Sequence, residues 1–378
     1  MRRLRDLLVL SLAVAMIAVA CSDGDTAETE ATAAPETTAA AETTAAQVDG
    51  GTLAAVLDRG VLNCGVSGSA VGFSETQADG SMTGIDADTC RAIAAAVLGD
   101  ATAVAFTETT AAERFEVLKS GAIDVLNRNT TWTQSRDSGD IGLDFGPTTY
   151  FDGQQVMGKA EFGFTDDSTL ADVDGAVLCT NAGTTTEKNI TEGAQVVGAE
   201  IQLKTVEQFP EALEGLKAGD CDLVTTDGSG LYGNRAKAIA DGEIEEGDWV
   251  IFPRAPISKE PLGPTYRAND SQWADIVNWT VFAMFIADEY GVTSANVDDF
   301  VAQGDDIAPE LGRLLGTVDG SLQEGMGLSA DAFYQVIKQV GNYDEIFGNN
   351  LNPLKIFREG TYNAQWTDGG LIYAPPAR

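Results

Sequence analysis

Three polar segments of the chain carry side chains that could bind a small charged solute. The first, residues 126–136, is rich in hydroxyls and amides and ends in Arg136. A guanidinium can hold a carboxylate through two parallel hydrogen bonds, which a lysine ammonium cannot do. Thr131 and Asn129 lie on the same segment and can add further hydrogen bonds. A polar surface turn, in which Arg136 pairs with a neighbouring aspartate, is the alternative.

The other two segments could hold opposite ends of such a solute. Residues 181–189 contain three consecutive threonines at a predicted helix start, where a threonine cap and Glu187 resemble a capping arrangement. Free N–H groups at that start also attract an anion. In residues 221–230, Asp227 can accept hydrogen bonds from an ammonium group, with capping of the turn at Gly228 as the alternative. Together the segments offer what a free α-amino acid requires.

Apolar patterning places these segments at the carboxyl ends of strands. The first predicted set is a strand at 60–66, a helix at 86–98, a strand at 104–106, a helix at 112–120 and a strand at 123–126. The second set is a strand at 176–179, helices at 185–192 and 209–218 and a strand at 222–225. Alternating strands and helices imply parallel sheets with right-handed crossovers. We expect two α/β lobes with a ligand cleft at the strand ends.

The N-terminus has the layout of a secretory signal that ends at a cysteine. Three arginines lie within the first five residues, and an apolar run then extends to Ala20, too short to span a bilayer comfortably. The layout resembles the lipobox of bacterial lipoproteins, although Ala18 stands where leucine is commonest. Residues 1–20 are therefore predicted to be a lipoprotein signal peptide and Cys21 the lipidated residue. A plain secretory signal with an incidental cysteine is the alternative.

Residues 21–51 are predicted to be a disordered acidic linker. They consist mostly of Ala, Thr and Glu, with no aromatic residue and no Lys or Arg. Such a segment cannot bury enough apolar surface to offset the entropy of ordering it. Its carboxylates repel one another and extend the chain, which suits a spacer between a membrane and a folded domain.

Composition excludes several functional classes. The formal net charge is −35 at pH 7, and histidine is absent. A chain this acidic does not bind nucleic acid or an anionic membrane by electrostatics. The lack of histidine removes the commonest general base, the commonest metal ligand and any Ser-His-Asp triad. The sequence therefore predicts no catalytic residues, no metal site and no cofactor.

Four cysteines follow the predicted linker. Outside the cytoplasm an even set favours two disulfides, for which three pairings exist. The spacing favours Cys64–Cys90 and Cys179–Cys221, one bond in each lobe. Four buried free thiols are the alternative. Because no CxxC motif occurs, structural zinc and thioredoxin-like chemistry are not expected.

Several segments resemble a known family. They are 64–66, 84–90, 127–137, 150–153, 183–187, 339–347 and 366–376, and the run from Asn127 to Thr133 is the most specific. The chain resembles the extracytoplasmic amino-acid-binding proteins of ABC importers, in the polar amino-acid group. It is most similar to the general L-amino-acid-binding proteins of that group. The resemblance extends from about residue 52 to residue 378.

The resemblance implies a two-lobed, periplasmic-binding-protein-like fold of type II. Each lobe would be a mostly parallel sheet flanked by helices, and two hinge strands would join them. Lobe 1, with a C-terminal extension, would comprise 52–152 and 260–378, and lobe 2 would comprise 153–259. The implied function is non-enzymatic capture of L-amino acids for an ABC permease that works with a separate ATPase. The protein would be lipid-anchored at the cell surface or in the periplasm.

Two other functions remain open at this stage. A cleft enzyme of the same fold, such as a dehydratase or lyase acting on amino acids, would need an acid or base of tuned pKa in the cleft. A ligand-sensing surface lipoprotein would have to signal through a separate partner.

The resemblance also implies roles for individual residues. Arg136 would hold the α-carboxylate, assisted by Thr131 and by the amides near Thr185 and Thr186. Asp227 would hold the α-ammonium from the other lobe.

Further residues are implied to lie near the ligand. The carbonyl or hydroxyl near Asn129 would assist the ammonium, and Arg128, Ser67 and Ala70 would lie close by. Related single-substrate binders stack the ligand between two aromatic rings, where this chain has Ala70 and Ala111. Their absence predicts a roomier pocket that accepts several amino acids. Arg114 and Arg128 would favour acidic or amide ligands unless neighbouring carboxylates satisfy them.

Overall fold

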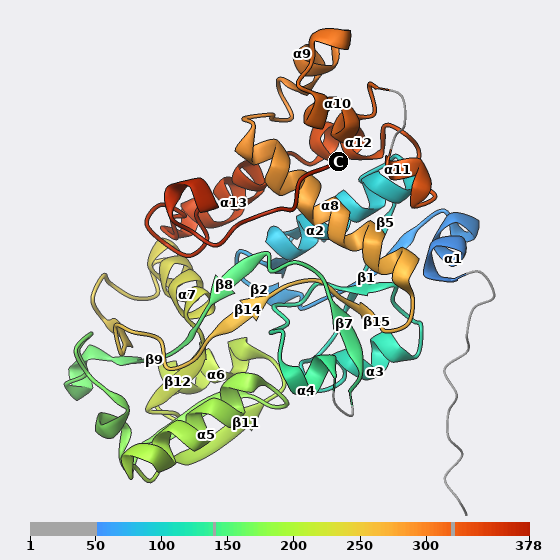
Figure 1. Cartoon of the computed structure of the whole chain (residues 1–378). Coiled ribbons are helices and arrows are strands. Elements are labelled where there is room, and N and C mark those ends of the chain that lie inside the picture. The colour runs from blue at the N-terminus through green and yellow to red at the C-terminus, as the bar shows by residue number, and fades with distance from the viewer. Residues whose placement is uncertain (1–50, 139–140, 319–321) are drawn as a thin grey trace, which may run out of the picture. The chain divides into compact units, whose positions relative to one another are not determined.

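The computed structural model describes residues 51–138, 141–318 and 322–378 (Figure 1). The predicted signal peptide, Cys21 and residues 22–50 of the predicted linker lie outside the described residues. Within the described ranges, no helix is long and apolar enough to cross a membrane.

Lobe 1 is built on a five-stranded sheet of order β5–β1–β6–β15–β7. Its strands are β1 (Leu62–Val66), β5 (Val104–Glu108), β6 (Val125–Leu126), β7 (Leu143–Phe145) and β15 (Thr265–Arg267). The associated elements are α1 (Gly51–Arg59), α2 (Ile85–Leu98), α3 (Arg114–Lys119), α4 (Gln134–Asp137) and a small sheet of β2 (Ser69–Ala70), β3 (Ser74–Thr76) and β4 (Met82–Thr83). β1 pairs in parallel with β5 and β6, as the predicted βαβαβ order requires.

Lobe 2 is built on a second sheet, of order β11–β10–β12–β9–β13. Its strands are β9 (Gln154–Lys159), β10 (Val177–Asn181), β11 (Gln202–Val206), β12 (Leu223–Asp227) and β13 (Trp249–Phe252). The helices are η1 (Ala160–Phe162), η2 (Leu170–Val173), α5 (Thr185–Val197), α6 (Phe209–Ala218) and α7 (Gly228–Ala240). Side chains of α6 and α7 bury one face of the sheet and those of α5 and η2 bury the other.

Two short strands join the lobes. β8 (Tyr150–Asp152) and β14 (Glu260–Leu262) form an antiparallel pair. The predicted two-lobed fold with two hinge strands is confirmed, but both sheets are mixed. In each sheet one strand, β15 or β9, is antiparallel to both neighbours. Each of these strands directly follows a hinge strand, so it starts at the cleft end of its sheet. It therefore runs in the opposite direction to the other four strands, whose carboxyl ends lie at the cleft.

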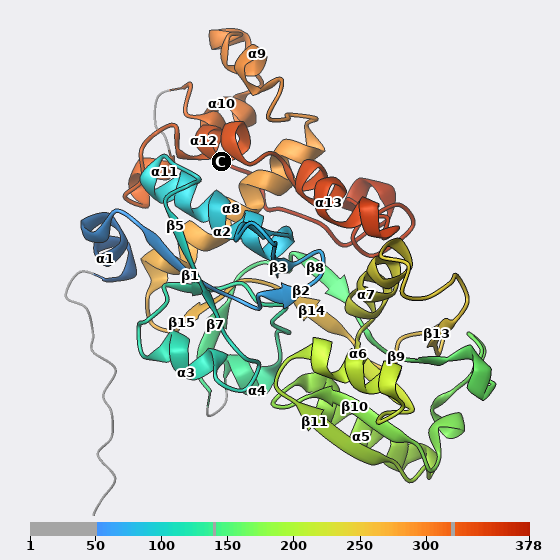
Figure 2. The same ribbon diagram turned by 180° about the vertical axis from the view of Figure 1, so that it is seen from behind.

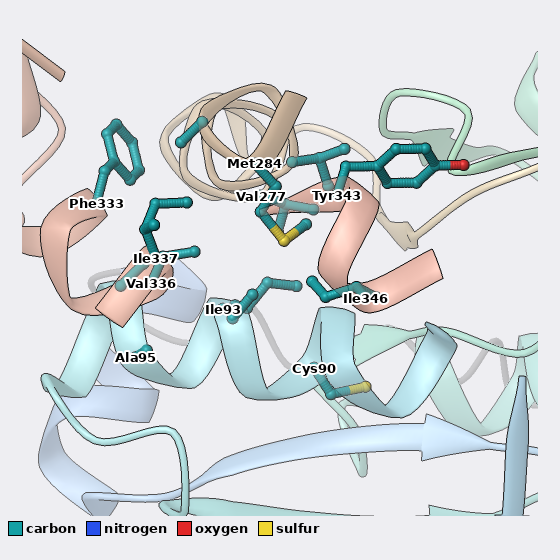
Figure 3. Packing of buried hydrophobic residues seen from close by; sticks show 14 of the residues in the cluster. Cys90, Ile93, Ala95, Val277, Met284, Phe333, Val336, Ile337, Tyr343 and Ile346 are labelled. Carbon is teal, nitrogen blue, oxygen red and sulfur yellow. The ribbon is translucent and has the colours of Figure 1, made fainter. Parts of the chain in front are cut away.

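A helical C-terminal region covers lobe 1. It comprises α8 (Ser271–Glu289), α9 (Val297–Val301), η3 (Gly304–Asp306), α10 (Pro309–Leu315), α11 (Leu322–Gly325), α12 (Ala332–Gln339), α13 (Tyr343–Leu351), η4 (Asn352–Leu354) and η5 (Trp366–Asp368). Figure 3 shows side chains of α8, α12 and α13 packed against α2, among them Met284, Ile337 and Ile346 around Ile93. Each is at most 2% exposed, and burying such a side chain stabilises the fold by about 1.5–3 kcal/mol.

This cover explains one difference from the sequence-based prediction. The helix predicted at 86–98 is present as α2, but it is buried almost all round rather than amphipathic. One face lies on the sheet and the other beneath α8 and α12. The run Ala94–Ala96, at most 2% exposed, supplies small side chains that allow close packing around the helix.

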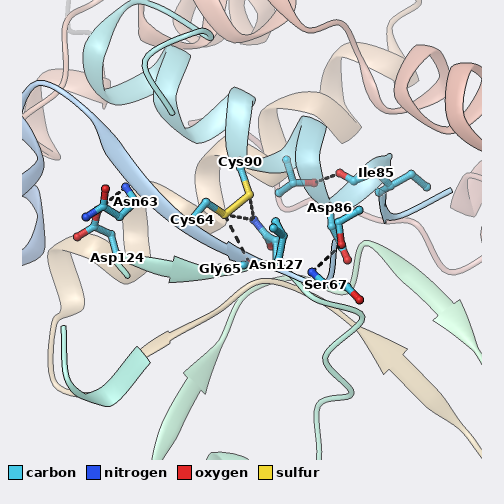
Figure 4. Close-up of a disulfide and its surroundings, with 12 residues drawn as sticks. Asn63, Cys64, Gly65, Ser67, Ile85, Asp86, Cys90, Asp124 and Asn127 are labelled. Carbon is cyan, nitrogen blue, oxygen red and sulfur yellow. Dashed lines mark hydrogen bonds between the residues drawn. A yellow bond between two sulfur atoms is a disulfide. The ribbon is translucent and has the colours of Figure 1, made fainter. Parts of the chain in front are cut away.

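Both predicted disulfides are present. Cys64–Cys90 joins β1 to α2 within lobe 1, and Cys179–Cys221 joins β10 to the residue pair before β12 within lobe 2. Figure 4 shows the first bond with Asn127, whose Nδ2 lies 3.3 Å from the Cys90 sulfur. The predicted pairing is therefore confirmed, and the alternative of four free thiols is wrong.

Several strands were not predicted by range. They are β2, β3, β4, β7 and β15 of lobe 1, β9, β11 and β13 of lobe 2, and the hinge strands β8 and β14. β11 (Gln202–Val206) is an edge strand with mostly exposed or half-buried residues, so it lacks the apolar run that revealed β10 and β12. The alternation of Ile201 and Leu203 with Gln202 and Lys204 at its start is the signal that could have found it.

Candidate solute-binding site

The carboxyl ends of strands from both sheets meet at one cavity. Its lining follows β1, β5 and β6 of lobe 1 and β10, β11 and β12 of lobe 2, whose sheets are seen from behind in Figure 2. The volume is about 80 Å³. A single water molecule needs roughly 10–15 Å³, so the cavity has room for several waters or one small solute.

The cavity brings together most of the predicted site residues. Those that line it are Ser67, Ala70, Arg128, Asn129, Thr131, Thr185, Thr186 and Asp227. They come from segments up to 160 residues apart, between Ser67 and Asp227. Arg136 is the predicted site residue that is not among the lining residues.

Arg136 reaches the cavity wall through Thr131. It is 5% exposed, and its Nη1 donates a hydrogen bond to the Thr131 carbonyl oxygen at 2.9 Å. Burial lowers the pKa of Arg136 to about 10, against the opposing effect of Glu260 and Asp227. Among the described residues it makes no ion pair, so the alternative of a pair with Asp137 is wrong, while Asp140, the other partner considered, lies outside the described residues.

Arg114 lines the cavity directly. It begins α3, is 2% exposed, and its Nε has no hydrogen-bond partner among the described residues. Its guanidinium lies 4.7 Å from the centre of the Phe115 ring, and that of Arg136 lies 5.2 Å from the same ring. Burial, and then the charges of Arg136 and Arg128, hold the pKa of Arg114 well below its usual value. An anion in the cavity would relieve this uncompensated positive charge.

Arg128 is partly satisfied within the protein. Its Nε donates to the Thr109 carbonyl oxygen at 2.9 Å. Burial lowers the pKa of Arg128 to about 10, while Asp86 and Glu113 act in the opposite direction. Neither carboxylate forms an ion pair with it within the described parts of the chain, so Arg128 is only partly neutralised.

Asn129 presents a buried acceptor beside the cavity. Its backbone has a positive φ of 41°, and its N–H donates to Asp86 at 2.8 Å. That aspartate is buried, and burial raises its pKa to about 6. The side-chain oxygen of Asn129 is buried and has no partner in the described chain. An ammonium group in the cavity could supply the missing donor.

The threonines after β10 form a capped helix start that touches lobe 1. Thr184 accepts a hydrogen bond from the Glu187 N–H at 3.0 Å, which confirms the predicted capping. The hydroxyl of Thr185 donates to Glu260 on the hinge at 2.8 Å. The same hydroxyl lies 3.3 Å from that of Thr131 in lobe 1. The helix start is thus joined to the hinge and to the opposite lobe.

Asp227 occupies the N-cap position of α7 without capping it. Instead, Asp152 on β8 accepts hydrogen bonds from the Ser229 hydroxyl and, at 3.3 Å, from the Ser229 N–H. Asp227 is 8% exposed, and its Oδ1 has no partner in the described residues. Burial, then the charges of Asp152 and Glu260, raises its pKa well above 3.8. The capping alternative is therefore wrong, and the carboxylate is left to the cavity.

Sequence reasoning missed several lining residues. Gln208 and Asn234 also line the cavity. Gln208 follows β11, one of the strands that were missed, and Asn234 lies one helical turn after Gly230 on α7, a spacing that could have indicated it. Phe73 packs in the core at 1% exposure and also contributes to the lining. Ala111, which the resemblance implied at a ligand-stacking position, is buried and does not line the cavity.

Comparison with known proteins assigns the fold and site to a family. A family model described as bacterial extracellular solute-binding proteins, family 3, matches residues 62–291. The chain belongs to this family. The family-3 assignment confirms an extracytoplasmic solute-binding protein and agrees with the cavity between two lobes.

Relatives of this family-3 protein cover nearly its whole described length. The general L-amino acid-binding periplasmic protein AapJ of Rhizobium johnstonii is 43% identical over 331 residues, 86% of this chain and 93% of AapJ. The glutamate/glutamine/aspartate/asparagine-binding protein BztA of Rhodobacter capsulatus is 40% identical over 338 residues, 88% and 96% of the two chains. Both are named as binding proteins, which favours that function over the cleft-enzyme alternative.

A solved structure is also closely similar to the family-3 chain. It is an ABC transporter periplasmic binding protein from Brucella ovis with glutathione bound. Sequence identity is 43% and the TM-score is 0.80, over 87% of this chain and 99% of that chain.

Proposed function

We propose that this protein captures a free L-amino acid between its lobes and delivers it to an ABC permease whose transport is driven by a separate ATPase. The observation that carries the proposal is a pair of buried, unpartnered groups on residues that line one cavity. The Nε of Arg114 belongs to lobe 1, and the Oδ1 of Asp227 belongs to lobe 2. A zwitterion supplies the missing partner of each, an anion for the first and a cation for the second.

The ammonium group would be held from both lobes. Asp227 supplies a carboxylate and Asn129 a neutral oxygen, and both are buried with an unsatisfied acceptor in the described chain. Hydrogen bonds to ionised groups are about twice as strong as those between neutral groups. Asp227 would therefore contribute most of the affinity for the ammonium.

The α-carboxylate would face the guanidinium groups that share the Phe115 ring. Arg114 lines the cavity, and Arg136 would complete the clamp from its place against Thr131. The N–H groups of Thr185 and Thr186 lie in the first turn of α5, where free backbone donors attract an anion.

The rest of the cavity favours ligands with an acidic or amide side chain. Arg128 is a buried, partly neutralised cation in the lining, with Ser67 and Ala70 nearby in the same lining. BztA is named for glutamate, glutamine, aspartate and asparagine, and AapJ for general L-amino acids. We therefore propose that several L-amino acids bind and that the acidic and amide members bind most tightly.

Ligand binding would favour the closed form, because the ligand contacts both lobes. A ligand shifts such an equilibrium only by its difference in affinity between the two states. We propose that the lobe boundaries fall after β8 and before β14, where the chain enters and leaves lobe 2. Lobe 1 then comprises 52–152 and 260–378, and lobe 2 comprises 153–259.

The proposal includes attachment to the membrane through the N-terminus. Residues 1–20 would be removed as a signal peptide, Cys21 would carry the lipid, and residues 21–51 would act as a spacer. The test is to express the full chain and Cys21→Ser in a bacterial host and to fractionate the cells. Loss of Cys21 should move the protein from the membrane to the soluble fraction, and an unchanged distribution would refute the anchor.

A thermal-shift screen tests the ligand assignment. The full chain is mixed with each of the twenty amino acids, and its unfolding temperature is recorded. We expect stabilisation by several L-amino acids that is largely lost in Arg136→Ala and in Asp227→Ala. Equal responses in the wild type and in both variants would refute the site.

A further inference from the structure

The family match ends well before the chain does. It covers residues 62–291, so residues 292–378, here named the C-terminal extension, lie beyond it. The extension packs on α2 and α8 of lobe 1 through α12 and α13 (Figure 3). Besides covering lobe 1, the C-terminal extension also contacts the hinge and lobe 2.

The C-terminal extension binds the backbone of hinge strand β8. The side chain of Asn363 accepts a hydrogen bond from the Phe151 N–H at 2.7 Å and donates one to the Phe151 carbonyl oxygen at 3.1 Å. Across the ladder, Pro261 of β14 stands opposite Phe151 and has no N–H to donate. Asn363 thus takes the place of a third strand beside β8. Two residues before Phe151, the Thr149 carbonyl oxygen accepts a hydrogen bond from the Tyr343 hydroxyl at 2.7 Å.

The C-terminal extension also reaches lobe 2 at Leu354. A Cβ placed on Gly233 of α7 would lie 3.5 Å from the Leu354 Cδ1. A Cβ placed on Gly72 of lobe 1 would lie 2.8 Å from the same atom. Leu354 therefore lies within van der Waals contact of the Gly233 position, as does Val71 of lobe 1 at 3.5 Å, and it leaves no room for a side chain at Gly72. Figures 1 and 2 both show α13, which leads into this turn, beside α7.

The helix that Leu354 touches belongs to the cavity. Asp227 immediately precedes α7, and Gly230 and Asn234 of α7 line the cavity. The Leu354–Gly233 contact therefore joins the C-terminal extension to a helix that lines the cavity. Any opening that moves α7 away from lobe 1 would break this contact.

We propose that the C-terminal extension is a third connection between the lobes, which steadies the hinge through Asn363 and stabilises the closed form through Leu354. A contact made in only one of two states shifts the equilibrium toward that state. The extension would thus increase the closed population without ligand and slow the release of bound solute. Only the effect on solute release rests on the proposed function.

Hydrogen exchange of the ligand-free full chain tests the connection. Leu354 is half-buried, so Leu354→Ala removes part of a leucine's burial, and we expect exchange at α7 and at residues 149–153 to rise roughly 3- to 10-fold. The matched control is Leu371→Ala, because Leu371 is in the C-terminal extension and 52% exposed. It should leave both segments unchanged. Unchanged exchange at α7 in Leu354→Ala, with lobe 1 still protected, would overturn the proposal.

A second variant separates the contact from the stability of the extension. Gly233→Leu places bulk on α7 against Leu354, and should also raise exchange at the hinge. Combining it with Leu354→Ala makes room for the new side chain, so the double variant should exchange more slowly than Gly233→Leu alone. Simple addition of the two effects would show that the residues do not interact and would refute the contact.

Dissociation kinetics test whether the C-terminal extension slows solute release. With L-glutamate and L-glutamine as probes in stopped-flow experiments, Leu354→Ala should release ligand about 3- to 10-fold faster than wild type. An unchanged rate would overturn the effect on release. If neither probe binds the wild type, the ligand assignment fails, while the exchange experiment still decides whether the connection exists.

Discussion

Asp152 and Glu260 stand opposite each other in the ladder formed by the two hinge strands, and each holds a different helix of lobe 2. Asp152 accepts hydrogen bonds from Ser229 at the start of α7. Glu260 accepts from Thr185 and Asn189 of α5, both at 2.8 Å. The hinge and the orientation of the two cavity-lining helices therefore depend on the same two carboxylates, of which Glu260 is buried and Asp152 half-buried.

Glu260→Gln tests the role of the hinge in positioning the site. Glu260 accepts hydrogen bonds from Thr185, Asn189 and Ser258, and an amide would present N–H groups to some of these donors. We expect affinity for L-glutamine to fall roughly 3- to 10-fold, as measured by isothermal titration calorimetry. Lys259→Gln, at the exposed neighbouring position, is the control and should bind as the wild type does. Equal affinity in both variants would contradict the role.

Asp227→Asn tests ammonium recognition. The change keeps the shape of the side chain but removes its charge, so amino-acid affinity should fall roughly 10- to 100-fold. Because Asp227 is buried without a partner in the described residues, its neutral replacement should raise the unfolding temperature of the ligand-free protein at pH 7. Weaker binding together with lower ligand-free stability would instead indicate a structural role.

Stability of the ligand-free protein should fall as pH rises from about 5 to 7. Burial raises the pKa of Asp86 and Asp152 to about 6, and it holds that of Asp227 well above its usual value. These carboxyls bind protons more tightly in the folded state than in the unfolded state, where the pKa is about 3.9. Their deprotonation therefore destabilises the fold. Calorimetric scans at pH 5, 6 and 7 measure the slope, which should be smaller in Asp227→Asn.

Amino-acid binding should release protons at any pH at which Asp227 is protonated in the ligand-free protein. Asp227 faces Asp152 and Glu260, which raise its pKa, and Arg136 and Arg114, which lower it. A bound ammonium favours the ionised carboxylate, so the proton leaves as the ligand enters. Titrations in two buffers of different ionisation enthalpy count the released protons. Release that persists undiminished in Asp227→Asn would assign the proton to another group.

Arg114→Met and Arg136→Met distinguish the two guanidinium groups beside Phe115. Arg114 lines the cavity with an unpartnered Nε, whereas Arg136 is bonded to the Thr131 carbonyl. Each change should weaken amino-acid binding roughly 10- to 100-fold through loss of a charged hydrogen bond. Only Arg114→Met should leave ligand-free stability unchanged or higher. Arg91→Met, in a surface ion pair with Asp88, is the control for both measurements.

The two-lobed architecture could be predicted because half of the strands in the two large sheets, β1, β5, β6, β10 and β12, have clear apolar patterns. The helix predicted at 209–218 coincides with α6, and the predicted disulfides formed because each pair belongs to one lobe. The mixed character of the sheets could not be predicted from those patterns. It follows from where β9 and β15 enter their lobes, which is a property of the hinge.

The sequence predicted which loops form the site better than it predicted the position of each side chain within them. The loops after β6, β10 and β12 do converge, as parallel sheets require. Which arginine lines the cavity could not be predicted, because no local sequence pattern distinguishes Arg114 from Arg136. Only the fold shows that Arg114 lines the cavity and Arg136 does not. The role of Asp152 could not be predicted either, because it accepts hydrogen bonds at the start of a helix 77 residues away in the chain.

The disulfides join cysteines in the order in which they leave the membrane during export. After the predicted signal peptide the sequence presents Cys21, Cys64, Cys90, Cys179 and Cys221, and the bonds link the second to the third and the fourth to the fifth. An oxidase that joins each new thiol to the preceding free one would reach this pattern without reshuffling, provided the first were blocked. The proposed acylation of Cys21 would therefore also protect the protein from mispairing during secretion.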